Sequence, residues 1–96
     1  AALAHLDAFA GRPFFLWVHY FDPHMPYEPP ATFAQAEGAG GRASRVMEDF
    51  RTSKRDLGRI YRGQGYPASE LDLARRLYAA EVAYTDQQLE RLLGEL

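Results

Sequence analysis

An uninterrupted apolar run, Phe14–Phe21, constrains the fold of this chain more than any other feature. All eight residues are aromatic or aliphatic except His19, and polar residues do not alternate with apolar ones. A strand buried on both faces has this pattern, as in a parallel sheet covered by helices on each side. Before it, Ala1–Ala10 has apolar residues at helical spacing, and Gly11 and Pro13 end that helix tail. This order predicts an α/β fold with one central buried strand and flanking helices.

The predicted strand has no neighbours in the sequence, because no second apolar run of this kind occurs in the 96 residues. Open strand edges are templates for aggregation, and buried backbone groups without partners cost about 1–3 kcal/mol each. Several such groups would offset the stability of a small domain, which is about 5–15 kcal/mol. We therefore expect an incomplete sheet, with residues 1–96 as an internal fragment of a larger domain.

A proline-rich loop, Asp22–Pro30, follows the predicted strand. Four prolines in nine residues remove four backbone donors and exclude both a helix and a central strand. The loop leaves the carboxyl end of the strand, where open α/β sheets bind their ligands. Residues 31–68 are predicted to be a solvated, partly helical insert. Residues 69–96 are predicted to form one amphipathic helix with Ser69 as its N-cap.

Composition excludes several classes of protein. The formal net charge of −2 provides no general attraction to nucleic acid or anionic lipid. No apolar run approaches the roughly 20 residues of a membrane span. The sequence has no cysteine, which excludes disulfides and thiolate metal sites.

His24 is the strongest candidate for chemistry. Pro23 and Pro26 restrict the backbone around it, so its ring can be aimed at small entropic cost. An imidazole, with an ordinary pKa of about 6.5, can bind an anionic oxygen when charged or donate a proton to a leaving alcohol. Such general acid catalysis is worth about 10²–10⁴ in rate. The alternative is a loop histidine that only caps a carbonyl.

Three neighbouring residues have weaker claims. Asp22 could orient His24 or accept backbone N–H groups within the turn, and turn chemistry is the favoured interpretation. Tyr27 could line a substrate cleft or simply pack. His19, Asp22 and His24 could together form a metal site, but two imidazoles and one carboxylate would leave it underfilled. We therefore predict no metal ligand in this chain.

Two blocks of sequence together resemble the sulfatase family of the alkaline-phosphatase-like superfamily. The first is Phe-Phe-Leu-Trp-Val-His followed by Asp-Pro-His-Met-Pro-Tyr, within residues 13–30. The second is Tyr-Ala-Ala-Glu-Val-Ala-Tyr-Thr-Asp, within residues 78–96. The resemblance implies hydrolysis of sulfate monoesters by a formylglycine nucleophile with bound calcium. It implies that His24 contacts the sulfate or the leaving-group oxygen.

The same resemblance implies that most of the active site lies elsewhere. Formylglycine is made from Cys-x-Pro-x-Arg or Ser-x-Pro-x-Arg, and neither motif occurs here. The family's calcium ligands do not map onto this chain either, so we expect the chain alone to be inactive. Its expected partners are the remainder of the catalytic domain and, for the parent enzyme, a sulfated small molecule or glycan. The basic stretch over residues 42–62 could attract such an anion, although a solvated surface is the simpler interpretation.

Two alternatives stay open. One is a phosphate or phosphonate ester hydrolase, or a phosphoryl-group transferase, of the same superfamily. The other is a non-catalytic, stand-alone small protein. The habit of the family suggests export to the periplasm or the cell exterior.

Overall fold

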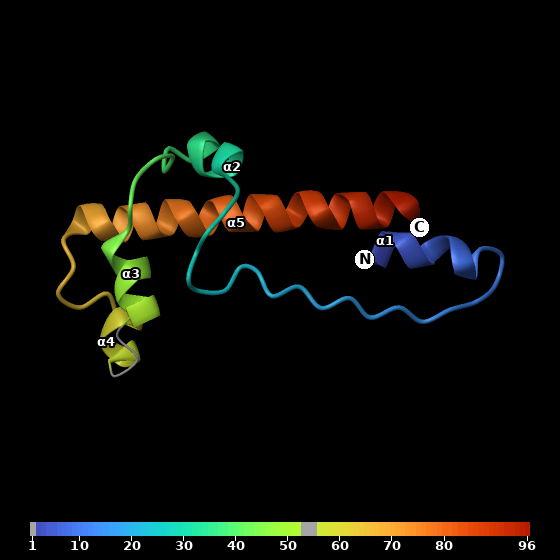
Figure 1. Cartoon of the computed structure of the whole chain (residues 1–96), viewed down its shortest axis with the longest axis horizontal. Coiled ribbons are helices and arrows are strands. Elements are labelled where there is room, and N and C mark those ends of the chain that lie inside the picture. The colour runs from blue at the N-terminus through green and yellow to red at the C-terminus, as the bar shows by residue number, and fades with distance from the viewer. Residues whose placement is uncertain (1, 53–55) are drawn as a thin grey trace.

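The computed structural model describes residues 2–52 and 56–96 (Figure 1), so Ala1 and residues 53–55 of the predicted insert lie outside the described residues. One long helix, α5 (Ala68–Glu95), forms the axis of a molecule that measures 55 × 30 × 17 Å. The shorter elements are α1 (Ala2–Leu6), the 3₁₀ helix η1 (Asp7–Phe9), α2 (Ala31–Ala36), α3 (Arg45–Thr52) and α4 (Leu57–Tyr61). Helices α1, α2 and α3 lie against α5, whereas α4 packs against α3 (Figure 1).

Helix α5 buries a single stripe of its surface. Leu73, Ala74, Leu77 and Ala80 are buried and recur at the spacing that brings residues onto one helical face. Its 28 residues span about 42 Å at 1.5 Å per residue. The predicted cap Ser69 is not the N-cap, because the helix begins one residue earlier, after Pro67, whose ψ of 155° is extended.

The core lies between the first half of α5 and the helices of the insert. Val46 and Met47 of α3 and Ile60 of α4 are the largest fully buried side chains. They pack in one cluster with Leu73, Ala74 and Leu77 of α5. Ser44 Oγ accepts the Met47 N–H at 3.3 Å, and the Asp56 side chain accepts the Arg59 N–H at the start of α4. These capping bonds satisfy N–H groups that helix starts leave without partners.

The predicted central buried strand is absent, and the α/β assignment is therefore wrong for this chain. Residues 14–21 run as an extended segment without strand pairing, and the described ranges 2–52 and 56–96 contain helices but no strand. A strand exists through hydrogen bonds to a neighbouring strand, and the described part of the chain supplies no such neighbour. Apolar character alone does not provide the pairing.

Burial of the 14–21 segment is also one-sided, contrary to the prediction. Leu16, Val18 and Tyr20 are half-buried and lie with Leu89 and Leu92 of α5 around a shallow apolar hollow. Residues between them are exposed: Phe15 is 93% exposed, and Trp17 is 82% exposed although it also lines this hollow. Figure 1 shows this segment running beside the second half of α5. Within the part of the chain that is described, no helix is both long and apolar enough to cross a membrane.

Candidate functional site

The proline-rich loop, Asp22–Pro30, crosses the middle of α5 and leads into α2 (Figure 1). Prolines cannot donate a backbone hydrogen bond, so the loop has few N–H groups with which to attach itself. The backbone N–H groups of two consecutive loop residues do form hydrogen bonds to helices. The Tyr27 N–H donates to Met47 Sδ on α3 at 3.0 Å, and the Glu28 N–H donates to Glu81 Oε1 on α5 at 2.6 Å. The loop is thereby held by two different helices.

His24 lies on this loop and is exposed to solvent. Its Nδ1 lies 2.6 Å from the backbone oxygen of Met25. A carbonyl oxygen can only accept, so Nδ1 carries the proton and donates. Nε2 makes no hydrogen bond within the described residues, which leaves this nitrogen for a ligand. It is an acceptor in the neutral ring and a donor in the charged ring.

Aromatic rings fix the His24 imidazole on two sides. The Phe21 ring lies 4.7 Å from it between centroids, tilted by 33°. The Phe50 ring of α3 meets it edge-on at 6.5 Å. Phe50 in turn lies 6.0 Å from Tyr61 of α4. These contacts restrict the ring and favour one orientation of Nε2.

An open pocket of about 310 Å³ lies beside the loop, between α3, α4 and α5. Its floor is apolar and includes Ile60 and Leu71. Its polar groups come from three tyrosines and two arginines: Tyr27, Tyr61, Tyr78, Arg62 and Arg75. Two guanidinium groups beside phenol rings are suited to an anion that carries an apolar or ring-shaped body.

Tyr27 belongs to this pocket rather than to a free loop surface. It is half-buried, and its ring lies 5.3 Å from that of Tyr78. Burial raises the pKa of Tyr27 above 10.0, and the neighbouring Tyr78 and Glu81 raise it further. The phenol therefore stays protonated and can donate a hydrogen bond near neutral pH.

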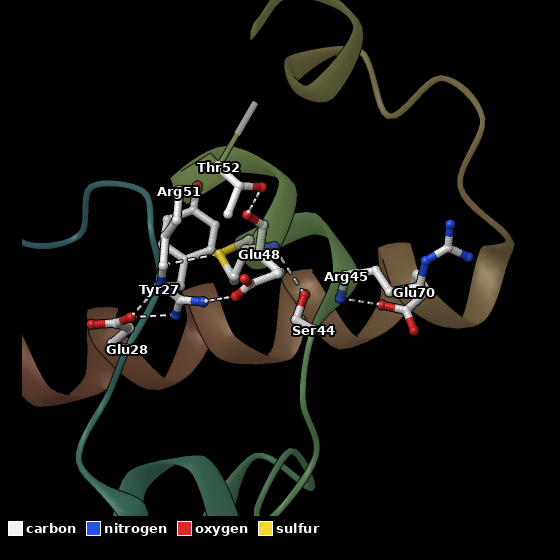
Figure 2. Close-up of polar contacts among 9 residues, drawn as sticks. Tyr27, Glu28, Ser44, Arg45, Glu48, Arg51, Thr52 and Glu70 are labelled. Carbon is white, nitrogen blue, oxygen red and sulfur yellow. Dashed lines mark hydrogen bonds and ion pairs between the residues drawn. The ribbon is translucent and has the colours of Figure 1, made fainter. Parts of the chain in front are cut away.

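A small ionic network ties the loop to α3. The guanidinium of Arg51 bonds to Glu28, with Nε 2.8 Å from Oε1, and to Glu48 Oε2 at 3.0 Å (Figure 2). All three side chains are substantially exposed. Exposed ion pairs contribute little to stability, typically about 0–1 kcal/mol. The network therefore directs Glu28 toward α3 more than it stabilises the fold.

Glu81 is the residue of this site that the sequence analysis missed. Its side chain is only 2% exposed, on the buried stripe of α5 directly after Leu77 and Ala80. Burial raises the pKa of the Glu81 carboxyl, whereas the hydrogen bond from Glu28 lowers it. The nearby carboxylate of Asp22 raises the pKa and His24 lowers it. A carboxylate one turn beyond Leu77, on an otherwise apolar stripe, was the available signal.

Comparisons with known proteins decide the family. The family model described as Sulfatase matches residues 1–96 of the chain. The chain belongs to the sulfatase family. A search of curated proteins found no match to this sulfatase chain, and a search of solved structures found none either.

The structure places the predicted site residues of the sulfatase chain as follows. His24 and Tyr27 lie on the same loop, with His24 facing solvent and Tyr27 facing the pocket. Asp22 is exposed, and within residues 2–52 and 56–96 its carboxylate makes no hydrogen bond to His24. Asp22 lies close enough to Glu81 to raise the pKa of that carboxyl. The His19 ring stacks on that of Trp17, with 6.4 Å between the ring centroids.

The calcium and formylglycine that the resemblance implies do not fit the described residues of this sulfatase chain. Calcium takes 6–8 oxygen ligands. Within the described residues, no group of three or more histidine, aspartate or glutamate side chains could hold a metal ion. The sequence has no cysteine and no serine in Ser-x-Pro-x-Arg, so it has no precursor of formylglycine.

Proposed function

We propose that this chain supplies His24, and the loop and pocket around it, to the active site of a sulfuric ester hydrolase. The substrate would be the sulfate monoester of a small molecule or glycan. The nucleophile and the calcium site would come from residues outside these 96. On this proposal the chain alone binds part of the substrate but does not turn it over.

The observation that carries the proposal is the hydrogen bond between His24 Nδ1 and the Met25 carbonyl at 2.6 Å. It assigns the proton on Nδ1, so Nε2 is the nitrogen that meets a ligand. In the charged ring, Nε2–H can donate to a sulfate oxygen. When the bond between sulfur and the leaving oxygen breaks, the same proton can pass to that oxygen, which leaves as the alcohol while the imidazole becomes neutral.

The open pocket beside the loop supports an organic sulfate as the substrate class. Its apolar floor and its tyrosines suit a ring, and Arg62 and Arg75 suit a further anionic group. Tyr27 would contact this organic part through its protonated phenol. The net charge of the chain does not contribute, since it is −2 overall.

The test uses the complete enzyme that contains this chain, assayed on a series of aryl sulfates whose leaving phenols range from acidic to weakly acidic. His24→Ala is expected to lower kcat by about 10²–10⁴, with the larger losses for the poorer leaving groups. His19→Ala is the matched control, because His19 is an exposed histidine of the extended segment that stacks on Trp17. Equal activity of His24→Ala and the unmodified enzyme would rule the proposal out.

The same assay distinguishes the other members of the superfamily. Aryl phosphates and phosphonates of matched leaving group are compared with the sulfates. A higher kcat/KM on the phosphorus esters would assign a phosphate or phosphonate ester hydrolase instead. Turnover of any of these esters by the 96-residue chain alone would contradict the claim that the nucleophile lies outside it.

A further inference from the structure

A buried carboxylate lies on the face of α5 that the loop crosses. Glu81 is the most deeply buried polar or charged residue within the described part of the chain, at 2% exposure. Taking a carboxylate out of water is costly unless hydrogen bonds or opposite charges compensate for it. Apolar residues occupy the rest of this stripe, so a leucine at this position would avoid the cost. The presence of a carboxylate at this buried position therefore needs an explanation.

Among the described residues, only one of the two Glu81 carboxylate oxygens has a hydrogen-bond partner. Oε1 accepts the Glu28 N–H at 2.6 Å. Oε2 is buried and has no hydrogen-bond partner within residues 2–52 and 56–96. The charged groups within reach are Asp22, His24 and Glu28, all from the proline-rich loop. The carboxylate is therefore directed at the loop that carries His24.

This contact matters to the loop because few of its backbone N–H groups bond to other elements. Its two neighbouring backbone donors, from Tyr27 and Glu28, go to Met47 and Glu81. The thioether sulfur of Met47 is a weak acceptor, whereas a carboxylate is a strong one. Helix α5 is a rigid platform of 28 residues, so a bond to it transmits a fixed position to the loop.

We propose that Glu81 is a positioning residue for His24, whose carboxylate holds the Asp22–Pro30 loop against α5 through the Glu28 N–H and so sets the direction of the His24 imidazole. The catalytic consequence rests on the proposed function of His24. The anchoring of the loop by Glu81 does not rest on that function. The anchoring and the catalytic consequence are therefore tested by separate measurements.

The first experiment measures anchoring in the 96-residue chain by nuclear magnetic resonance. Glu81→Ala removes the acceptor, and the Glu28 amide is expected to exchange with solvent about 10–100-fold faster, as the loss of a bond to a charged group implies. Glu81→Gln keeps a carbonyl acceptor and is expected to retain most of the protection. Glu90→Gln, on an exposed position of the same helix, is the control.

The fold of each variant is checked through the amides of Leu73 and Leu77, which should stay protected. Contacts between the His24 ring and the rings of Phe21 and Phe50 are measured in the same samples. They are expected to persist in Glu81→Gln and to weaken in Glu81→Ala. Unchanged exchange of the Glu28 amide and unchanged ring contacts in Glu81→Ala would overturn the proposal.

The second experiment measures the catalytic consequence in the complete enzyme on aryl sulfates. Glu81→Ala is expected to lower kcat by roughly tenfold or more while changing KM little, because a misplaced acid costs rate more than affinity. Glu81→Gln should recover most of kcat. Normal activity of Glu81→Ala, in an enzyme that His24→Ala inactivates, would overturn positioning. Full activity of both variants would overturn the function proposed for His24 and leave the anchoring result unaffected.

Discussion

The backbone N–H of Glu28 and the carboxylate of Glu81 lie 2.6 Å apart, although 53 residues separate them in the sequence. This contact joins the proline-rich loop to the long helix α5. It also links the two blocks of sequence that carry the resemblance to sulfatases. The loop and the helix therefore form one structural unit, and its properties can be tested through the groups that hold it together.

Glu81 should make the stability of the chain depend on pH. The folded pKa of Glu81 is raised above its ordinary 4.5, so the folded state binds the proton more tightly than the unfolded state. The resulting stabilisation is fully present below pH 4.5 and is lost as pH rises through the raised folded pKa. We expect Glu81→Gln to lack this loss, so the variant gains stability relative to the unmodified chain as pH rises.

Urea unfolding at a series of pH values measures this difference, with Glu90→Gln as the exposed control on the same helix. The control should follow the unmodified chain at every pH. If the unmodified chain instead gained stability relative to Glu81→Gln as pH rose, the carboxyl would have to be stabilised in its charged form.

Met47 is expected to contribute both to the core and to the loop. It is 2% exposed, and its sulfur accepts the Tyr27 N–H. Met47→Ala should lower the free energy of unfolding by about 2–5 kcal/mol, because it leaves a cavity. Met47→Leu keeps most of the volume and should cost less than about 1.5 kcal/mol. Because Met47→Leu removes the sulfur, the Tyr27 amide should exchange with solvent faster in this variant than in the unmodified chain. Equal exchange rates in the variant and the unmodified chain would count against the sulfur contact.

Arg51 should matter little for stability despite its two ion pairs. It bonds to Glu28 and Glu48 at an exposed position, where water and salt screen the attraction. Arg51→Gln is expected to cost about 0–1 kcal/mol in urea unfolding at low salt, and less at high salt. A cost well above this range, or one that does not fall with salt, would show that the network is far better shielded than its exposure indicates.

Residues Leu16 and Phe15 provide a direct test of the extended segment. Leu16 is half-buried against α5, whereas its neighbour Phe15 is 93% exposed. Leu16→Ser should therefore destabilise the chain, and Phe15→Ser should change its stability by no more than about 0.5 kcal/mol. Similar large losses for both variants would point to a segment that is buried on its two faces.

Trp17 reports on the same segment by fluorescence. It is the single tryptophan of the chain and is 82% exposed. Its emission should be quenched by iodide almost as efficiently as that of a free tryptophan derivative. Strong protection from iodide in a monomeric sample would contradict the one-sided packing of residues 14–21.

Local sequence was sufficient for the elements that depend on neighbouring residues. The helical spacing of Leu71, Ala74 and Tyr78 predicts one helix over residues 69–96, and the structure has a helix over Ala68–Glu95. The prolines of Asp22–Pro30 predict a loop, because a missing N–H and a fixed φ act on the backbone wherever the chain goes. The motifs in these two regions were also sufficient to indicate the sulfatase family, which the family model confirms.

Tertiary structure decided what depends on partners distant in the sequence. Phe14–Phe21 has the composition of a buried strand, but a strand forms only beside another strand, and α5 covers one face of this segment. Glu81 looks like an ordinary helix residue until the loop crosses it and donates the Glu28 N–H. The sequence determined where the helix and the loop form, because those preferences are local. Only the fold determined what they contact, because hydrogen bonds and burial require both partners to be in place.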